Sequence, residues 1–169
     1  MKAIVAMDLN RTIGNNGKLP WPKIAEDMAF FKEMTVFGNL IMGRKTFESV
    51  GTLPLRYTYV LSREHENKQL ICNTAAYINI DEVKNIENYK YHPDYSVETW
   101  VCGGAEIYKQ LLPHCTDVYV THVLGEYEGD AFMPEFENEF PVQMIMEEAK
   151  DFWIVRYSKP STCFASCSG

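Results

Sequence analysis

The sequence predicts an α/β fold in a single domain, with a mainly parallel central sheet and an antiparallel edge. Two observations lead to this fold class. Short apolar segments typical of strands alternate with helical segments over the first two-thirds of the chain, an order typical of parallel sheets flanked by helices. Residues 142–149 and 152–158 then form two strand-like segments joined by a tight turn at Lys150-Asp151, which indicates an antiparallel hairpin.

The elements of the first half follow in order. Residues 2–7 form an apolar run and are predicted as a buried strand, and turn signals at Gly14-Asn15-Asn16-Gly17 indicate a loop after it. Apolar residues at helical spacing predict a helix over 23–35. The elements expected next are a strand at 39–43, a short helix at 44–50, a loop holding Pro54 at 51–56, and a strand rich in β-formers at 57–62.

The second half begins less regularly. Its first expected elements are a short strand at 69–72, a polar helix at 80–86 and a tyrosine-rich surface loop at 88–96. The elements after them are a strand at 98–102, a helix at 105–112 closed by Pro113, and a strand at 117–124. We therefore expect all these elements to form one domain over residues 1–159. The tail, 160–169, has little periodicity, and we expect it to be disordered.

Composition and charge are those of an ordinary soluble globular protein. Of the 169 residues, 46% are hydrophobic and 23% are charged. The 16 basic and 23 acidic side chains give a net charge of −7, which argues against general affinity for nucleic acid or an anionic membrane. No apolar run has the length of a membrane span, and the start lacks the layout of a signal peptide. We therefore expect a cytoplasmic protein, and a monomer.

The cysteines and histidines do not predict a metal site. The five cysteines are odd in number and irregularly spaced (Cys72, Cys102, Cys115, Cys163 and Cys167), so we expect reduced thiols. Cys163 and Cys167 lack partners at the spacing of metal ligands, and the histidines are scattered.

One charge interrupts the apolar pattern of the helix predicted at 23–35. A single helical stripe contains Ile24, Asp27, Met28, Phe31 and Met34, of which only Asp27 is charged. A carboxylate that faces inward must be paired, protonated or bound to a ligand. Its two oxygens suit a flat heterocycle that presents an N–H and an amino group side by side. The alternative is that Asp27 lies at the edge of the helix, in solvent.

Three strand ends carry residues that suit a phosphorylated ligand, which in open α/β sheets binds beyond the carboxyl ends of the strands. These strands run into Gly43-Arg44-Lys45-Thr46, Ser62-Arg63 and Gly103-Gly104. Cationic and hydroxyl side chains bind phosphate, and paired glycines let the backbone approach a ligand. Each feature alone is common in a solvated turn, but together they predict a nucleotide with more than one phosphate group. Neither the phosphate-binding loop ending in Gly-Lys-Ser/Thr nor the Rossmann glycine pattern is present.

These residues resemble the dihydrofolate reductase family over nearly the whole chain, from Ala3 to about Ser158. The matching segments lie in family order: Ile13-Gly14 to Leu19-Pro20-Trp21, the helix of Asp27 and Phe31, Ile41 to Phe47, Leu61-Ser62-Arg63, Trp100 to Gly104 with Ile107-Tyr108, Val120-Thr121-His122, and Gly129-Asp130. The resemblance implies an eight-stranded mixed sheet flanked by about four helices. It also implies NADPH-dependent reduction of 7,8-dihydrofolate to tetrahydrofolate, and binding of antifolate inhibitors.

On the substrate side, the resemblance implies that Asp27 binds N3 and the 2-amino group of the pterin, supported by Thr121. It implies that Trp21 holds a water beside Asp27, that Leu19 controls the water that protonates N5, and that Arg56 pairs with the α-carboxylate of the glutamate tail. The remaining substrate-binding residues are apolar: Ile4, Val5, Met28, Phe31, Val50, Leu53 and Cys102, the last standing where the family usually has Ile or Val.

On the cofactor side, the resemblance implies that Arg44, Ser62 and Arg63 surround the adenosine 2′-phosphate of NADPH. Tyr108 would lie near the nicotinamide and the pterin, and Gly103-Gly104 matches a cis peptide bond of the family. The other implied cofactor-binding residues are Ala6, Ile13, Gly14, Gly43, Lys45, Thr46, Leu61, Ala105 and Ile107.

Two other functions are also compatible with these residues. One is a related pteridine or pyrimidine reductase, such as that of riboflavin synthesis, whose phosphorylated substrate does not need the carboxylate clamp of Arg56. The other is a non-catalytic protein that binds folate or NADPH. The presence of Asp27, Trp21 and the glycine-rich loop argues against a non-catalytic protein. A turnover assay separates an enzyme from a protein that only binds these ligands.

Overall fold

The computed structural model describes residues 1–65, 69–83 and 97–160. The strands of the main sheet are β1 (Lys2–Met7), β3 (Asn39–Gly43), β4 (Tyr57–Leu61), β5 (Leu70–Cys72), β6 (Ala75–Ile78), β7 (Thr99–Val101), β8 (Asp117–Val123), β10 (Val142–Glu148) and β11 (Phe152–Ser158). Two short strands, β2 (Thr12–Gly14) and β9 (Ala131–Phe132), form a separate antiparallel pair. The helices are α1 (Ala25–Thr35), α2 (Arg44–Val50), α3 (Ile80–Val83) and α4 (Ala105–Leu111), followed by a 3-10 turn, η2 (Leu112–His114).

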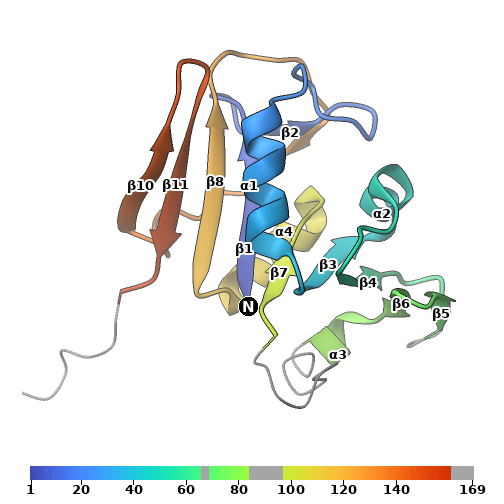
Figure 1. Ribbon diagram of the computed structural model, residues 1–169. Helices are drawn as coiled ribbons and strands as arrows, with labels where there is room; N and C mark the ends of the chain where they lie inside the picture. The colour runs from blue at the N-terminus through green and yellow to red at the C-terminus, as the bar shows by residue number, and fades with distance from the viewer. Residues whose placement is uncertain (66–68, 84–96, 161–169) are drawn as a thin grey trace, which may run out of the picture.

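The main sheet is mixed and mainly parallel, which confirms the predicted fold class. Over the described ranges its nine strands lie in the order β10-β11-β8-β1-β7-β3-β4-β6-β5 (Figure 1). Parallel ladders join β1 to β7 and β8, β3 to β4 and β7, and β4 to β6. Antiparallel ladders are found at the two edges, where β11 pairs with β8 and β10, and β5 with β6. The C-terminal hairpin was predicted correctly.

The number of strands differs from the expected eight because β6 was not predicted. Its sequence, Ala75-Ala76-Tyr77-Ile78, begins with two alanines, which do not favour strands. Burial against β4 outweighs this weak propensity, since Ala75 and Ala76 are both buried. The short strands β2 and β9 were also missed, because two or three residues give no periodicity.

One helix boundary also differs from the prediction. α1 begins at Ala25 because Ile24 is extended, so Ile24 does not belong to the helical stripe. α3 is described only over Ile80–Val83. The rest of the helix expected at 80–86, the loop expected at 88–96 and residues 161–169 of the tail lie outside the described residues.

Both faces of the sheet are covered near its centre, as Figure 1 shows for α1 on one face and α4 on the other. The alternation of β1 divides its side chains between two hydrophobic clusters. Ala3, Val5 and Met7 belong to the cluster that includes Tyr108 of α4, whereas Ile4 belongs to the cluster that packs against Phe31 of α1. Burial on both faces fixes β1 at the middle of the molecule, and its carboxyl end lies beside α1.

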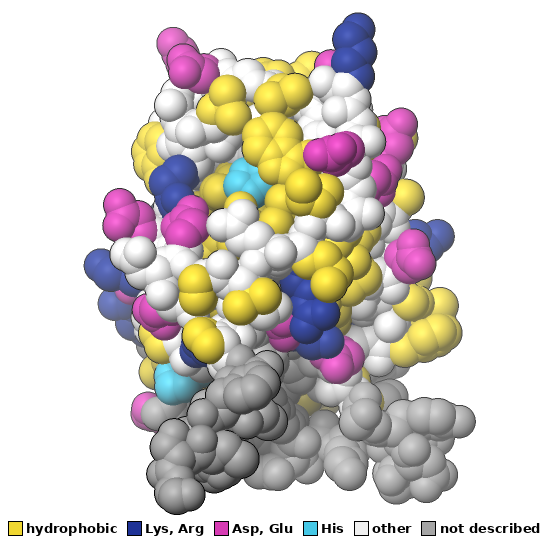
Figure 2. Space-filling view, turned by 90° about the vertical axis from the view of Figure 1, so that its left-hand side faces the viewer, with side chains coloured by type: hydrophobic (Ala, Val, Ile, Leu, Met, Phe, Trp, Pro, Cys, Tyr) yellow, Lys and Arg dark blue, Asp and Glu magenta, His cyan; other side chains and the backbone are white. Residues whose placement is uncertain are grey.

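The edge formed by β10 differs from this centre, because all seven of its residues are exposed. Figure 2 shows this side of the molecule, where apolar side chains lie among acidic and basic ones. None of the helices in the described ranges is long and apolar enough to cross a membrane.

Candidate active site

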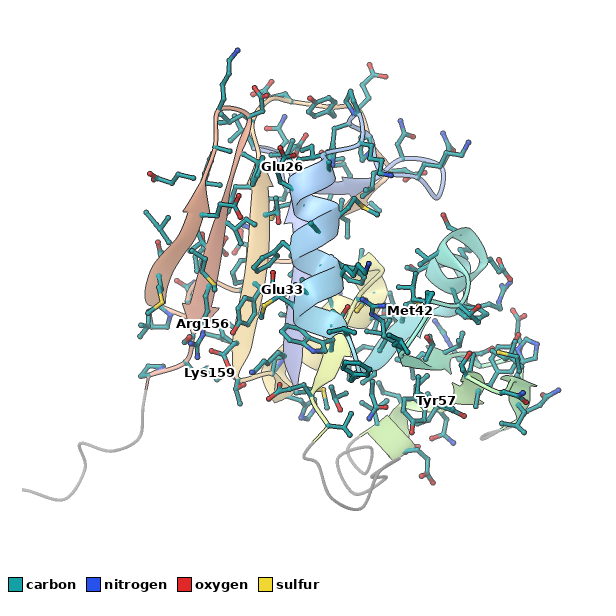
Figure 3. The ribbon with its side chains drawn as sticks, viewed as in Figure 1. Glu26, Glu33, Met42, Tyr57, Arg156 and Lys159 are labelled. Carbon is teal, nitrogen blue, oxygen red and sulfur yellow. The ribbon has the colours of Figure 1, made fainter. Side chains whose placement is uncertain are left out.

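A cavity of about 2250 Å³ extends from α1 along the carboxyl ends of β1, β3, β4 and β7. Met42 of β3, labelled in Figure 3, lies in its wall between α1 and α2. A pocket for one drug-sized ligand has a volume of about 300–1,000 Å³. This cavity therefore has room for two such ligands side by side, in the place where open α/β sheets bind them.

Nearly all the predicted site residues line this cavity. The exceptions are Trp21 and Thr121, which are buried outside its wall. Thr121 reaches the site through a hydrogen bond to Asp27. Trp21 packs edge-on against Tyr127, with ring centroids 5.8 Å apart, and its expected role beside Asp27 stays a prediction.

Asp27 lies in the first turn of α1, is half-buried and lines the cavity, so it does not lie fully in solvent at the edge of the helix. Burial raises the pKa of its carboxyl group above the ordinary value of 3.8, and the hydrogen bond from Thr121 partly opposes this shift. No cationic side chain in the described part of the chain forms an ion pair with Asp27. A ligand that donates two hydrogen bonds would supply the missing partners of the carboxylate.

The stripe around Asp27 faces the cavity more than the core. Phe31 is half-buried and packs against the cluster of Leu40 and Trp100. Met28 is 43% exposed although it was expected to face inward. The reason is that α1 borders an open cavity at this point, so Met28 contributes to its wall without being covered by protein.

Arg56 lies at the α1 end of the cavity and is 7% exposed. Its Nε donates to Thr35 Oγ1 at 2.8 Å, and its two terminal nitrogens donate to the carbonyls of Pro54 and Lys32 at 2.6 and 2.8 Å. A guanidinium has five N–H groups, so one on each terminal nitrogen has no acceptor among the described residues. Two such groups on the neighbouring terminal nitrogens of a guanidinium can bind a carboxylate as a fork.

Gly43, Gly103 and Gly104 line the cavity at the ends of the paired strands β3 and β7. The Gly103–Gly104 peptide bond is cis, as the resemblance implies, and Gly103 has a φ of +109°. The Gly43 N–H donates to the Gly103 carbonyl at 2.8 Å. A Cβ on Gly43 would lie 3.2 Å from Ile107 Cγ1, so a larger residue would push α4 away from the cavity.

Tyr108 and Cys102 lie close to these glycines in the cavity wall. The Tyr108 hydroxyl donates to the Ile4 carbonyl at 2.7 Å, and burial raises the pKa of this phenol well above its ordinary range. Burial also raises the pKa of the Cys102 thiol. Both groups are therefore protonated at neutral pH, and neither adds charge to the site.

The far end of the cavity contains the expected cationic residues. Arg44 pairs with Glu48 at 2.7 Å and lies 3.7 Å from Glu64. Its side chain is 33% exposed, and Arg63 is exposed as well. The Ser62 hydroxyl lies 2.8 Å from Nδ1 of His65. The two glutamates and His65 were not predicted as site residues. Glu64 and His65 come directly after Arg63 in the sequence, and Glu48 lies one helical turn after Arg44.

The loop between β1 and α1 covers part of the cavity through Leu19, which is 48% exposed. Asn16 of this loop donates a backbone N–H to Asp130 at 3.0 Å, and Ser49 of α2 donates to the Gly17 carbonyl. At its base, buried Asp8 accepts backbone N–H groups from Asn10, Thr12 and Tyr127. Sequence reasoning missed Asp8 and Ser49, although an aspartate directly after an apolar strand could have indicated Asp8.

The cavity has a partly buried carboxylate at one end and a cationic, glycine-lined region at the other. These features indicate the class of protein to which the chain belongs. They are typical of α/β enzymes that hold a flat heterocycle beside a phosphorylated cofactor. The sequence model of the dihydrofolate reductase family matches residues 1–152. The chain belongs to the dihydrofolate reductase family.

Individual relatives agree with this assignment. The chain is 37% identical to dihydrofolate reductase of Bacillus subtilis over 135 residues, which are 79% of this chain and 75% of that protein. It is 38% identical to dihydrofolate reductase type A13 of Escherichia coli over 132 residues, 78% and 75% of the two chains. Among solved structures, dihydrofolate reductase from Enterococcus faecalis, complexed with NADP(H) and RAB-propyl, superposes with a TM-score of 0.76 at 30% identity, covering 94% of this chain and 95% of that one.

Proposed function

We propose that this protein catalyses the NADPH-dependent reduction of 7,8-dihydrofolate to 5,6,7,8-tetrahydrofolate. The observation that carries the proposal is the placement of Asp27, without a cationic partner in the described chain, in the same cavity as Arg44, Ser62 and the Gly103–Gly104 pair. Such a cavity can hold a pterin against the carboxylate while a phosphorylated dinucleotide lies along the strand ends.

The α1 end binds the substrate. Asp27 accepts hydrogen bonds from N3 and the 2-amino group of the pterin, and Thr121 orients the carboxylate from behind. Arg56 uses its two remaining N–H groups for the α-carboxylate of the glutamate tail. The residues that enclose the rings are Ile4, Val5, Met28, Phe31, Val50, Leu53 and Cys102.

The strand-end region binds the cofactor. Its residues fit NADPH, because Arg44, Ser62 and Arg63 line the same cavity and can hold a 2′-phosphate. Lys45 and Thr46 follow at the start of α2, where they would hold the pyrophosphate. Bound NADPH supplies the hydride for C6 of the pterin. The chain supplies the alignment through the backbone of Ala6, Ile13, Gly14 and Gly43 and through Leu61, Ala105 and Ile107, which all line the cavity.

The protein also controls a proton, which must reach N5 of the pterin. Asp27 binds the opposite edge of the ring and therefore cannot donate that proton directly. It fixes the electrostatics of the pterin, and a water admitted past Leu19 delivers the proton. Trp21 would help to hold an ordered water beside Asp27, and Tyr108, which lines the cavity, would lie near the nicotinamide and the pterin.

The reaction takes place in residues 1–159 of a monomeric chain in the cytoplasm, where the thiols of Cys72, Cys102 and Cys115, which are free in the structure, stay reduced. Antifolates with a flat, amino-substituted ring compete with the substrate for Asp27.

The experiment that tests the proposal follows the loss of NADPH absorbance on addition of dihydrofolate, and repeats the assay with NADH. We expect rapid oxidation of NADPH and slower oxidation of NADH. If the folded protein binds both ligands without oxidising NADPH, the catalytic proposal is wrong and a binding protein remains.

A further inference from the structure

A compact hydrogen-bonded turn follows β4 at the cationic end of the cavity. The Ser62 hydroxyl oxygen accepts the backbone N–H of Glu64 at 3.2 Å and lies 2.8 Å from Nδ1 of His65. The His65 ring stacks on Tyr77 of β6, with centroids 3.8 Å apart and planes inclined by 9°. Both Ser62 and His65 line the cavity. The imidazole is therefore held in place from one face while one of its nitrogens faces the serine.

The hydrogen-bond capacity of the serine determines what His65 can do. A hydroxyl has one proton and two acceptor lone pairs, and Glu64 already occupies one lone pair. When Nδ1 of His65 carries a proton, it donates to the second lone pair. The Ser62 proton then has no acceptor within the turn and is free to be donated into the cavity. When Nδ1 lacks a proton, Ser62 donates to His65 instead and the cavity loses this donor.

The two arrangements favour different ligands. A phosphate oxygen only accepts hydrogen bonds, so it selects the arrangement in which Ser62 donates into the cavity. A ribose hydroxyl can donate as well as accept, so it fits either arrangement and gains little from His65. The stacked histidine therefore affects a phosphorylated ligand more than the same ligand without that phosphate.

We infer that His65 is a positioning residue that makes Ser62 a donor to the phosphate on the adenosine ribose of the cofactor, and thereby raises the preference for NADPH over NADH. The inference rests on the proposed function, because it assumes that the adenosine end of NADPH lies at Ser62. It concerns a residue that acts through Ser62 and that lies outside the family motif from which the cofactor site was predicted.

Two substitutions separate the hydrogen bond from the ring stack. His65→Phe keeps an aromatic ring on Tyr77 but has no nitrogen to donate. His65→Asn loses the ring but has an amide N–H near the position of Nδ1. The matched control is His114→Phe, which changes an exposed histidine outside the cavity wall. Thermal melting of each variant checks that it is folded.

The binding test uses two fragments that differ only by the ribose phosphate, adenosine 2′,5′-bisphosphate and adenosine 5′-monophosphate, in isothermal titration. We expect His65→Phe to weaken binding of the bisphosphate by up to about fivefold, because Ser62 keeps its proton but loses the N–H that turns this proton toward the cavity, and to leave the monophosphate unchanged. His65→Asn retains most of the wild-type affinity. With whole cofactors, His65→Phe raises the KM for NADPH by a similar factor while kcat and the KM for NADH stay constant.

A double-mutant cycle shows whether the effect passes through the serine. In a Ser62→Ala background, His65→Phe should cause no further loss of bisphosphate affinity. Additive losses, or a loss in His65→Asn as large as in His65→Phe, would overturn the role of His65 while leaving the cofactor assignment intact. If the wild type binds both fragments equally, the adenosine end is not at Ser62, and the cofactor assignment is wrong together with the inference.

Discussion

The two ends of the cavity differ in burial and in charge. At the α1 end, one carboxylate faces a partly buried apolar wall, and burial raises its pKa. At the strand ends, several cations lie near the surface, and Arg44 is 33% exposed and already paired with Glu48. The effective dielectric constant is low at the first end and high at the second, so a single interaction is strong at Asp27 and weak at Arg44. We therefore expect substrate binding to be most sensitive to a single group, Asp27, whereas the preference for one cofactor should be spread over several weaker contacts.

The largest effect is expected at Asp27. Asp27→Asn should lower kcat/KM for dihydrofolate at pH 7 by at least about 100-fold, because it removes the charge that fixes the pterin. The affinity for NADPH, measured by fluorescence titration, should stay the same. Glu33→Gln is the matched control, since Glu33 is an exposed acid on the same helix (Figure 3). Equal activity of the Asn variant and the wild type would remove Asp27 from the site.

Arg56 comes next. Arg56→Lys keeps a positive charge but loses the fork, so the KM for dihydrofolate should rise by about tenfold, with no change in the KM for NADPH. The variant should also unfold more easily, because Thr35 and the carbonyls of Pro54 and Lys32 lose donors. A dihydropterin without the glutamate tail separates the two effects. If its KM rises as much as that of dihydrofolate, Arg56 acts on the fold alone.

The cationic end should respond more weakly and depend on salt. Arg44→Ala should raise the KM for NADPH by several-fold, up to about tenfold, at low ionic strength, and the effect should shrink at high salt because this region is exposed. The KM for NADH should hardly change. Glu64→Gln should act in the opposite direction, since it removes a carboxylate 3.7 Å from Arg44. An equal loss for both cofactors in Arg44→Ala would contradict binding of the 2′-phosphate at this end.

The loop contact at Ser49 should have a smaller effect. Ser49→Ala removes the hydrogen bond to the Gly17 carbonyl that joins the loop to α2. We expect NADPH to dissociate about threefold faster, the size of one partly exposed hydrogen bond, with stopped-flow fluorescence as the measurement. An unchanged dissociation rate would show that this contact does not hold the loop over the cofactor.

The smallest effect concerns stability and pH. The folded state holds the Asp27 proton more tightly than the unfolded state, because burial raises its pKa above 3.8. As pH rises from that value through the raised pKa, the wild type therefore loses this contribution to the free energy of unfolding. Asp27→Asn lacks the titrating group, so it should gain stability relative to the wild type over that interval. Denaturant titrations of both proteins at several pH values measure the difference, and two parallel pH curves would contradict it.

The order of the elements was predictable because it depends on local patterns. The apolar run of β1, the helical spacing in α1 and the tight turn of the C-terminal hairpin are each set by neighbouring residues. β6 was not predictable in this way, since two alanines become a strand only when β4 supplies a partner. The start of α1 was also misplaced, because nothing local distinguishes the extended Ile24 from the first helical residue.

The amino-acid sequence was enough to identify which chemical groups the site contains: the one acid in an apolar stripe, the cations after strands, and the glycine pair. The three-dimensional arrangement was needed to show that these groups share one cavity, that Asp27 faces it, and that Trp21 is buried without lining it. It also decided the contacts of Asp8, Ser49 and His65, each with a partner that the sequence does not indicate. This division arises because residue type sets which hydrogen bonds a side chain can donate or accept, whereas burial and long-range pairing decide which partners it meets.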